Sequence, residues 1–159
     1  MKSRYTEPGS QVGGFGCHGL ESPPPRIDTC RGNAVGPVTF TGTMHGDATY
    51  DESGWVEPDG TIRYDGADYV DGGIKGCGKG RYVIETFDGY IDMKRYDPAT
   101  NSAPGFNAWR VRAGGGTGEI GSVIGGHGVN HWRAYFGWYA GMSVHFGEGT
   151  FTGTIRCRS

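Results

Sequence analysis

Glycine spacing is the feature that most restricts how this chain can fold. Glycine supplies 32 of the 159 residues, against an ordinary share of about 7%, and it follows no Gly-X-Y repeat. In GGGTGEIGSVIGGHG, residues 114–128, it returns at short intervals, which oppose a helix but are compatible with turns and bent strands. Gly116, Gly118 and Gly121 match G-x-G-x-x-G, yet a dinucleotide site also needs a helix after the loop. We therefore expect an all-β chain whose glycines form tight turns and corners.

Length and charge exclude several classes of protein. A chain of 159 residues with a formal net charge of −2 is about one domain long and has no basic surface for nucleic acid. No apolar run of about 18 residues is present to span a membrane. The first ten residues have no apolar core of a signal peptide. We expect no nucleic-acid partner and no membrane span.

The four cysteines predict disulfides rather than a metal site. No C-x-x-C pair is present, so a zinc ribbon or a thioredoxin-type motif is not indicated. Of three connectivities, we expect Cys17–Cys30 to close a short N-terminal loop and Cys77–Cys157 to tie an inner strand to the last one. Four reduced thiols in a cytosolic protein are the alternative. Disulfides would indicate an extracytoplasmic, secreted protein, an inference that rests on the cysteines alone.

Composition divides the chain into an arm and a domain. Residues 1–37 are rich in Gly, Ser and Pro and predict an irregular N-terminal arm held by the first disulfide. Residues 38–159 contain recurring strand-like segments bounded by turn residues, which predict the folded domain. Residues 93–105, bracketed by Pro98 and Pro104, predict a loop or at most one helical turn.

Alternation within the segments separates two faces. In VTFTGTMHGDATY, Phe40, Met44 and Ala48 lie on the face opposite the threonines, and GTFTGTIRC near the C-terminus repeats this pattern with Phe151 and Ile155. Glycine alternating with bulky residues on the inward face is what a small barrel needs at its corners. We expect an antiparallel barrel of about eight strands, closed or nearly closed.

Three segments carry a resemblance to a known family. They are DGTIRYDGADYVDGGIKGCGKGRYVIETFDG, VRAGGGTGEIGSVIGGHG and the terminal GEGTFTGTIRC. Together they resemble bacterial members of the allene oxide cyclase-like barrel group, over roughly residues 38–157. The cysteine-bearing arm and the aromatic stretch HWRAYFGWYAGM depart from the usual pattern.

The resemblance implies a fold and a kind of chemistry. Relatives include plant allene oxide cyclases, dirigent proteins and bacterial cyclases of polyketide-derived compounds. It implies an eight-stranded antiparallel barrel whose lumen holds a small hydrophobic molecule, with no metal and no organic cofactor. Related proteins also pack into dimers or trimers, so a homo-oligomer is expected. A fold alone does not transfer an activity.

Three residues are the catalytic candidates. If Val83 and Phe87 face the lumen, Glu85 lies among apolar neighbours that raise its pKa and suit it to acid–base work; in the opposite phase Glu85 is a solvated surface residue. Tyr64 is a candidate inward hydroxyl for an oxyanion, or else a packed ring. Arg110 either binds a carbonyl or carboxylate group of the substrate or lies with Arg112 on the solvent-exposed outer face of the barrel.

Aromatic residues are the ligand-binding candidates. They line a lumen or a barrel mouth in the functional interpretation, and form ordinary core or a subunit interface in the other. The candidates are Phe87, Trp109, Trp132 and Trp138, and the last two belong to a cluster with Tyr135, Phe136 and Tyr139.

No metal site is expected. Asp65, Asp68 and Asp71 could bind calcium, but they lack the spacing of an EF-hand, and a solvated turn is the favoured interpretation. His127 and His131 would lie about 13 Å apart on a strand, too far for one ion.

Three functions are compatible with these residues. The first is a cofactor-independent cyclase, isomerase or lyase that acts on a small hydrophobic molecule in the lumen. The second is a secreted glycan-active enzyme that uses a carboxylate pair such as Glu85 and Glu148, which must lie about 5 to 10 Å apart. The third is a secreted barrel that binds a ligand without catalysis. We favour the first, and whether the chain is an enzyme stays open at this point.

Overall fold

The computed structural model is an all-β protein made of long antiparallel strands. It describes residues 2–8, 11–17, 30–57, 59–113, 116–136 and 144–158. The elements in chain order are β1 (Lys2–Pro8), β2 (Gln11–Cys17), β3 (Cys30–Gly42), β4 (Met44–Val56), β5 (Ile62–Ile74), β6 (Gly78–Ile91), η2 (Met93–Arg95), β7 (Ser102–Val111), η3 (Gly118–Ser122), β8 (Val123–Phe136) and β9 (Val144–Cys157).

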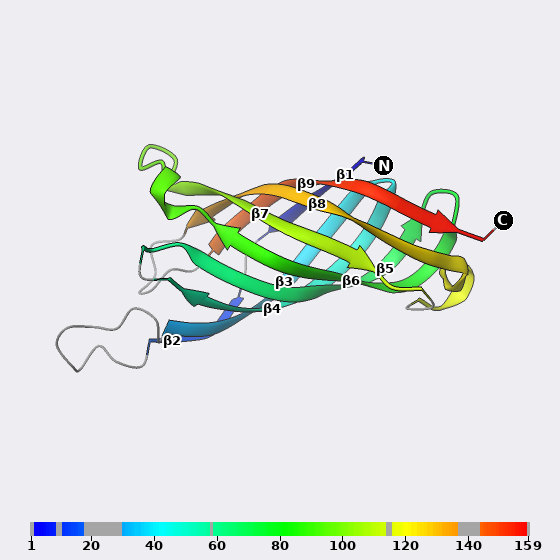
Figure 1. Ribbon diagram of the computed structural model, residues 1–159, viewed down its shortest axis with the longest axis horizontal. Coiled ribbons are helices and arrows are strands. Elements are labelled where there is room, and N and C mark those ends of the chain that lie inside the picture. The colour runs from blue at the N-terminus through cyan, green and yellow to red at the C-terminus, as the bar shows by residue number, and fades with distance from the viewer. Residues whose placement is uncertain are drawn as a thin grey trace.

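Strands β3 to β9 pair in chain order and form one curled antiparallel sheet. These seven strands by themselves form a half-barrel that is not closed, and its concave side is called the interior below. Figure 1 shows the strands lying obliquely across one another as the sheet curls. Strand β1 pairs with both β9 and β3, and β2 pairs with the first part of β3. The predicted all-β antiparallel class is confirmed.

The predicted irregular arm over residues 1–37 is wrong for its described parts. Residues 2–8 and 11–17 are strands, and β3 begins at Cys30 rather than near Val38. Pro8 is the last residue of β1, and a register shift between Gly13 and Gly16 interrupts the β2–β3 ladder, so these strands accommodate both residue types. The prediction of a loop or at most one helical turn over residues 93–105 is confirmed by η2 at its start. It is wrong at its end, where residues 102–105, including Pro104, belong to β7.

The two predicted faces of the strands are confirmed. Phe40, Met44 and Ala48 are buried in the interior, whereas Thr49 is exposed. On β9, Phe151 is buried and Thr154 is exposed. Period-two alternation therefore separates core from solvent, as expected for a sheet with one buried face.

The interior is filled by aromatic rings that lie over glycines of neighbouring strands. Tyr64 stands opposite Gly89 in the β5–β6 ladder, and a Cβ atom at Gly89 would lie 2.5 Å from the Tyr64 ring. Trp109 stands opposite Gly128, where a Cβ would lie 2.8 Å from Cζ2 of the indole. Trp132 has the same relation to Gly105. Glycine thus makes room for large side chains on a tightly curled sheet.

One end of the half-barrel contains a disulfide and the short 3-10 helix η3. Cys77, in the β5–β6 turn, is bonded to Cys157 at the end of β9, as the sequence predicted, with the two Cα atoms 5.5 Å apart. Next to it, η3 places Ile120 in the core with 0% of its surface exposed. Ile120 on η3 therefore covers one end of the core, and the element that follows η3 is strand β8.

Packing of rings over glycine predicts a large stability difference between two glycine variants. Gly128→Ala should lower the free energy of unfolding by about 2 kcal/mol or more, because the new methyl group meets the Trp109 ring and the Thr152 carbonyl. Gly121→Ala is the matched control, since its Cβ would meet nothing closer than 3.7 Å. Urea denaturation of both variants measures the difference, and equal stabilities would contradict this account of the core.

Candidate functional site

A polar layer crosses the interior between two hydrophobic clusters. The larger cluster includes Met44, Ile84 and Trp109, and the smaller one includes Ile62 and Ile91. Along the strands, the inward positions between these clusters are polar. They are Glu52 on β4, Asp68 on β5, Thr86 on β6, Asn107 on β7 and Asn130 on β8.

Hydrogen bonds link the polar layer to two aromatic rings. The indole N–H of Trp132 donates to the Tyr64 hydroxyl over 2.6 Å. That hydroxyl lies 3.1 Å from Oδ1 of Asn107, to which it donates, and Asn130 donates to the same Oδ1 over 2.8 Å. Because each member holds the next, these four side chains have defined positions in the interior.

Asp68 is the buried acid of this layer. Its exposed fraction is 5%, and burial raises the pKa of its carboxyl group from 3.8 to about 7. Burial also raises the pKa of Tyr82, with a smaller contribution from the charge of Asp68. A carboxyl group with a pKa near neutral pH is suited to take up and release protons under ordinary conditions.

A small cavity lies within the polar layer. It is lined by Glu52, Tyr64, Asp68, Thr86, Asn107, Asn130, Trp132 and Phe151, and it leaves about 10 Å³ for the centre of a water molecule. That is room for about one water. The Thr86 Oγ1 atom is buried and has no hydrogen-bond partner within the described part of the chain. The cavity thus offers a carboxyl group and an unused hydroxyl to a water-sized group.

Two of the predicted site residues line this cavity. Tyr64 is inward and 5% exposed, so the predicted inward hydroxyl is confirmed, and Trp132 packs edge-on against it with ring centroids 5.8 Å apart. Trp109 is inward but fully buried, and its N–H donates to the Val129 and Thr152 carbonyls. Trp109 is therefore core rather than ligand-binding surface.

Glu85, Arg110 and Phe87 lie on the outer face. Of the two phases considered for Glu85 the lumenal one is therefore wrong, and the outer-wall alternative is confirmed for Glu85 and Arg110. Tyr82, Ile84 and Thr86 take the inward phase of β6. Glu85 forms ion pairs with Arg110 and Arg112, the second over 2.8 Å, and the hydrogen bond from Arg110 lowers the pKa of Glu85. The Arg110 guanidinium also lies over the Phe87 ring, 5.3 Å from its centroid. Glu85, its two arginine partners and Phe87 therefore form an ion-paired cluster on the outer face of the sheet.

The proposed carboxylate pair of Glu85 and Glu148 is not brought together. The row of paired residues that contains Glu85 runs through Arg110 and His127 to Thr154 on β9. Thr154 and Glu148 are separated along β9 by roughly 20 Å at 3.3 Å per residue. A glycan-cleaving pair at these two positions is therefore excluded by the register.

Strand β5 contains Asp65, Asp68 and Asp71, so the favoured prediction of a turn is wrong for all three, and the predicted exposure to solvent is wrong for Asp68 alone. Asp65 and Asp71 are exposed while Asp68 points inward. The imidazoles of His127 and His131 are on the exposed face of β8. Among the described residues, no group of three His, Cys, Asp or Glu side chains could hold a metal ion.

Two predictions lie outside the described residues. Trp138 falls in the undescribed segment 137–143. The Cα atoms of Cys17 and Cys30 stand opposite each other in the β2–β3 ladder, but the side chains of this pair are outside the description.

A signal for Asp68 was present in the sequence. Ile62, Tyr64 and Val70 are all inward on β5, and continuing their alternation places residue 68 on the same face. The Asp-Gly composition of YDGADYVDGG suggested a turn and masked this alternation.

The comparisons with known proteins give no match. No protein-family model matches the chain, no curated protein matches its sequence, and no solved structure matches its fold. Within the described ranges, no helix is long and apolar enough to cross a membrane.

Burial of Asp68 predicts an unusual dependence of stability on pH. Because the pKa of Asp68 is raised in the folded state, the folded protein keeps the Asp68 proton at pH values where the unfolded chain has lost it. The free energy of unfolding should therefore fall by up to about 4 kcal/mol between about pH 4 and pH 7, and should level off above that range. Asp68→Asn should be more stable than the natural protein at pH 8 and should lose this slope.

Urea denaturation from pH 5 to pH 8 measures the slope. This range lies above the lowered pKa values of Glu85 and Asp97, whose contributions are lost only at more acid pH. Asp71→Asn, on the exposed face of the same strand, is the control and should keep the natural slope. An unchanged slope in Asp68→Asn would show that Asp68 is not the group responsible.

Proposed function

We propose that this protein is a cofactor-independent proton-transfer enzyme, of isomerase or lyase type, with its site in the interior polar layer. The observation that carries the proposal is the buried Asp68 carboxyl, whose pKa is about 7, beside an unused Thr86 hydroxyl in one cavity. Relative to the sequence prediction, Asp68 replaces Glu85 as the acid–base group, and Thr86 replaces Arg110 as the group that holds the substrate oxygen.

The proposed step is a proton shift within one molecule. The Asp68 carboxylate removes a proton from a carbon next to a carbonyl group, while the Thr86 hydroxyl donates a hydrogen bond to the carbonyl oxygen as negative charge develops there. Asp68 then returns the proton to a different carbon of the same molecule. The product is an isomer, so the step needs no external oxidant or reductant.

The size of the cavity limits the substrate. Space for about one water accommodates a carbonyl oxygen. Binding of the carbon atoms next to that oxygen requires partly buried side chains of the smaller cluster to move aside, which argues against a hydrophobic molecule of drug size. The remainder of a substrate would enter from the smaller cluster, where Met93, Trp132 and Phe136 are only partly buried. The substrate class we propose is therefore a small carbonyl compound.

Closure of the half-barrel by β1 forms part of the proposal. β1 is paired with β9 from Lys2 to Pro8 and with β3 from Ser3 to Thr6, and a strand paired on both sides would join the two edges into a closed eight-stranded barrel. Closure would keep bulk water away from Asp68. The Cys77–Cys157 disulfide is compatible with an extracellular location, and we propose that the protein works outside the cytoplasm.

A second candidate is a ligand-binding barrel without catalysis. The observation that favours it is the filled larger cluster, in which Phe40, Met44, Trp109 and Phe151 are at most 2% exposed. In that case the polar layer only specifies the fold, and recognition takes place on the outer wall.

Solvent deuterium exchange tests the proposed function without a known substrate. The protein is incubated in D₂O at pH 7 with acetone, cyclohexanone and 2-cyclohexenone, and proton NMR follows deuterium incorporation next to the carbonyl. We expect incorporation above the protein-free rate with at least one ketone, and a loss of about 100-fold in Asp68→Asn.

Glu85→Gln is the matched control, because its carboxyl group lies on the outer wall, and it should keep the natural rate. Equal incorporation with the natural protein, with Asp68→Asn and without protein would contradict catalysis and support the second candidate.

A further inference from the structure

A row of aromatic and polar side chains crosses the outer wall of the half-barrel. Each member stands directly opposite the next in the strand ladders from β4 to β8. Their strand neighbours point inward, so the five side chains share the outer face. The members are Trp55, Arg63, Tyr90, Phe106 and His131, and they are called the outer row below.

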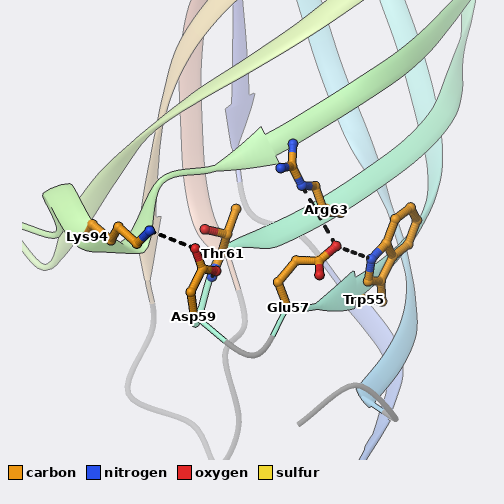
Figure 2. Close-up of polar contacts among 6 residues, drawn as sticks. All are labelled: Trp55, Glu57, Asp59, Thr61, Arg63 and Lys94. Atoms are coloured by element: carbon orange, nitrogen blue, oxygen red, sulfur yellow. Dashed lines mark hydrogen bonds and ion pairs between the residues drawn. The ribbon is translucent and has the colours of Figure 1, made fainter.

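Contacts hold the outer row in one arrangement. Glu57 accepts a hydrogen bond from the Trp55 indole over 2.9 Å and lies 3.9 Å from Nε of Arg63, as Figure 2 shows. The Arg63 guanidinium lies over the Tyr90 ring, 5.4 Å from its centroid. A ligand that binds here therefore meets side chains that are already ordered, which lowers the entropic cost of binding.

The rings themselves form a connected surface. Tyr90 and Phe106 are stacked, with centroids 5.6 Å apart and planes inclined by 30°. Phe106 and His131 meet edge to face with centroids 5.3 Å apart. At a strand spacing of about 4.8 Å, five positions extend over roughly 19 Å. The surface is long and narrow, and it runs across the strands.

The charge of the outer row selects among possible ligands. The charge of Arg63 is balanced by Glu57, and the whole chain has a formal net charge of −2. Single-stranded nucleic acid needs a positively charged groove besides stacking rings, and anionic lipid needs a basic cluster. An uncharged ligand with flat apolar faces and hydroxyl edges matches the row better than either.

We propose that the outer row binds an extended, uncharged polysaccharide strand laid across β4 to β8. Sugar rings have apolar C–H faces that pack on the exposed Trp55 ring and on the solvent-facing parts of Tyr90 and Phe106 that their neighbours leave uncovered. Their hydroxyl groups reach the Glu57 carboxylate and the Arg63 guanidinium. The outer row is separate from the interior polar layer, and the proposal does not depend on proton transfer at Asp68.

Native gel electrophoresis in gels containing a polysaccharide tests the proposal. Hydroxyethyl cellulose and soluble starch are the uncharged probes, and dextran sulfate is the anionic probe. We expect retardation by an uncharged probe, with affinity reduced about fivefold or more in Tyr90→Ala, which loses a stacking ring. Tyr90→Phe keeps the ring and should keep most of the affinity.

Tyr69→Ala is the matched control. Tyr69 is a more exposed aromatic residue of the same wall, with 55% of its surface accessible, but it is outside the outer row. Retardation should be unchanged in Tyr69→Ala and in Asp68→Asn. Circular dichroism of each variant checks that the sheet is intact.

Three results would overturn the proposal. The first is no retardation by either uncharged probe. The second is retardation by dextran sulfate alone, which would indicate a charge-driven surface. The third is a concentration-dependent dimer, seen by sedimentation velocity and abolished in Tyr90→Ala, together with unchanged gel mobility, which would make a second copy of the chain the occupant.

Discussion

Packing of aromatic rings over glycine is the interaction on which the rest of this structure depends. Tyr64 over Gly89, Trp109 over Gly128 and Trp132 over Gly105 each place a large ring opposite a residue without a side chain in the adjacent strand. A sheet that curls this tightly has too little interior space for large side chains at every inward position. Glycine at the opposing positions lets the rings enter, and the rings then fill the core that the strands enclose.

The same packing determines where chemistry is possible. Because rings and aliphatic side chains pack on both sides of the polar layer, four of its members are buried and only Glu52 is partly exposed. Burial is the cause of the raised pKa of Asp68. An ionised carboxylate in such a place destabilises the fold, whereas a protonated or ion-paired carboxyl group does not. The outer wall differs from the interior because its polar groups stay in contact with solvent. There, contacts at the surface order Arg63, Glu57 and the rings of the outer row.

Much of the fold could be predicted from alternation and turn chemistry, whereas the acid–base residue could not be placed correctly. The inward set of Phe40, Met44 and Phe151 follows from period-two patterns. The Cys77–Cys157 disulfide belongs to the favoured one of the three connectivities that four cysteines allow. On β6 the alternation alone was ambiguous, because a register shift between Phe87 and Tyr90 changes the inward phase from even to odd positions. Such a bulge depends on the neighbouring strand, so a single sequence does not reveal it.

Titration of the Asp68 carboxyl group is the most direct test of the account. Carbon-13 NMR of the protein labelled at aspartate side chains, with Asp68→Asn used for assignment, measures its pKa in the folded state. The account predicts a midpoint of about 7. A midpoint close to the ordinary 3.8 would mean that the carboxyl group is solvated or paired, and it would contradict both the buried polar layer and the proton-transfer site built on it.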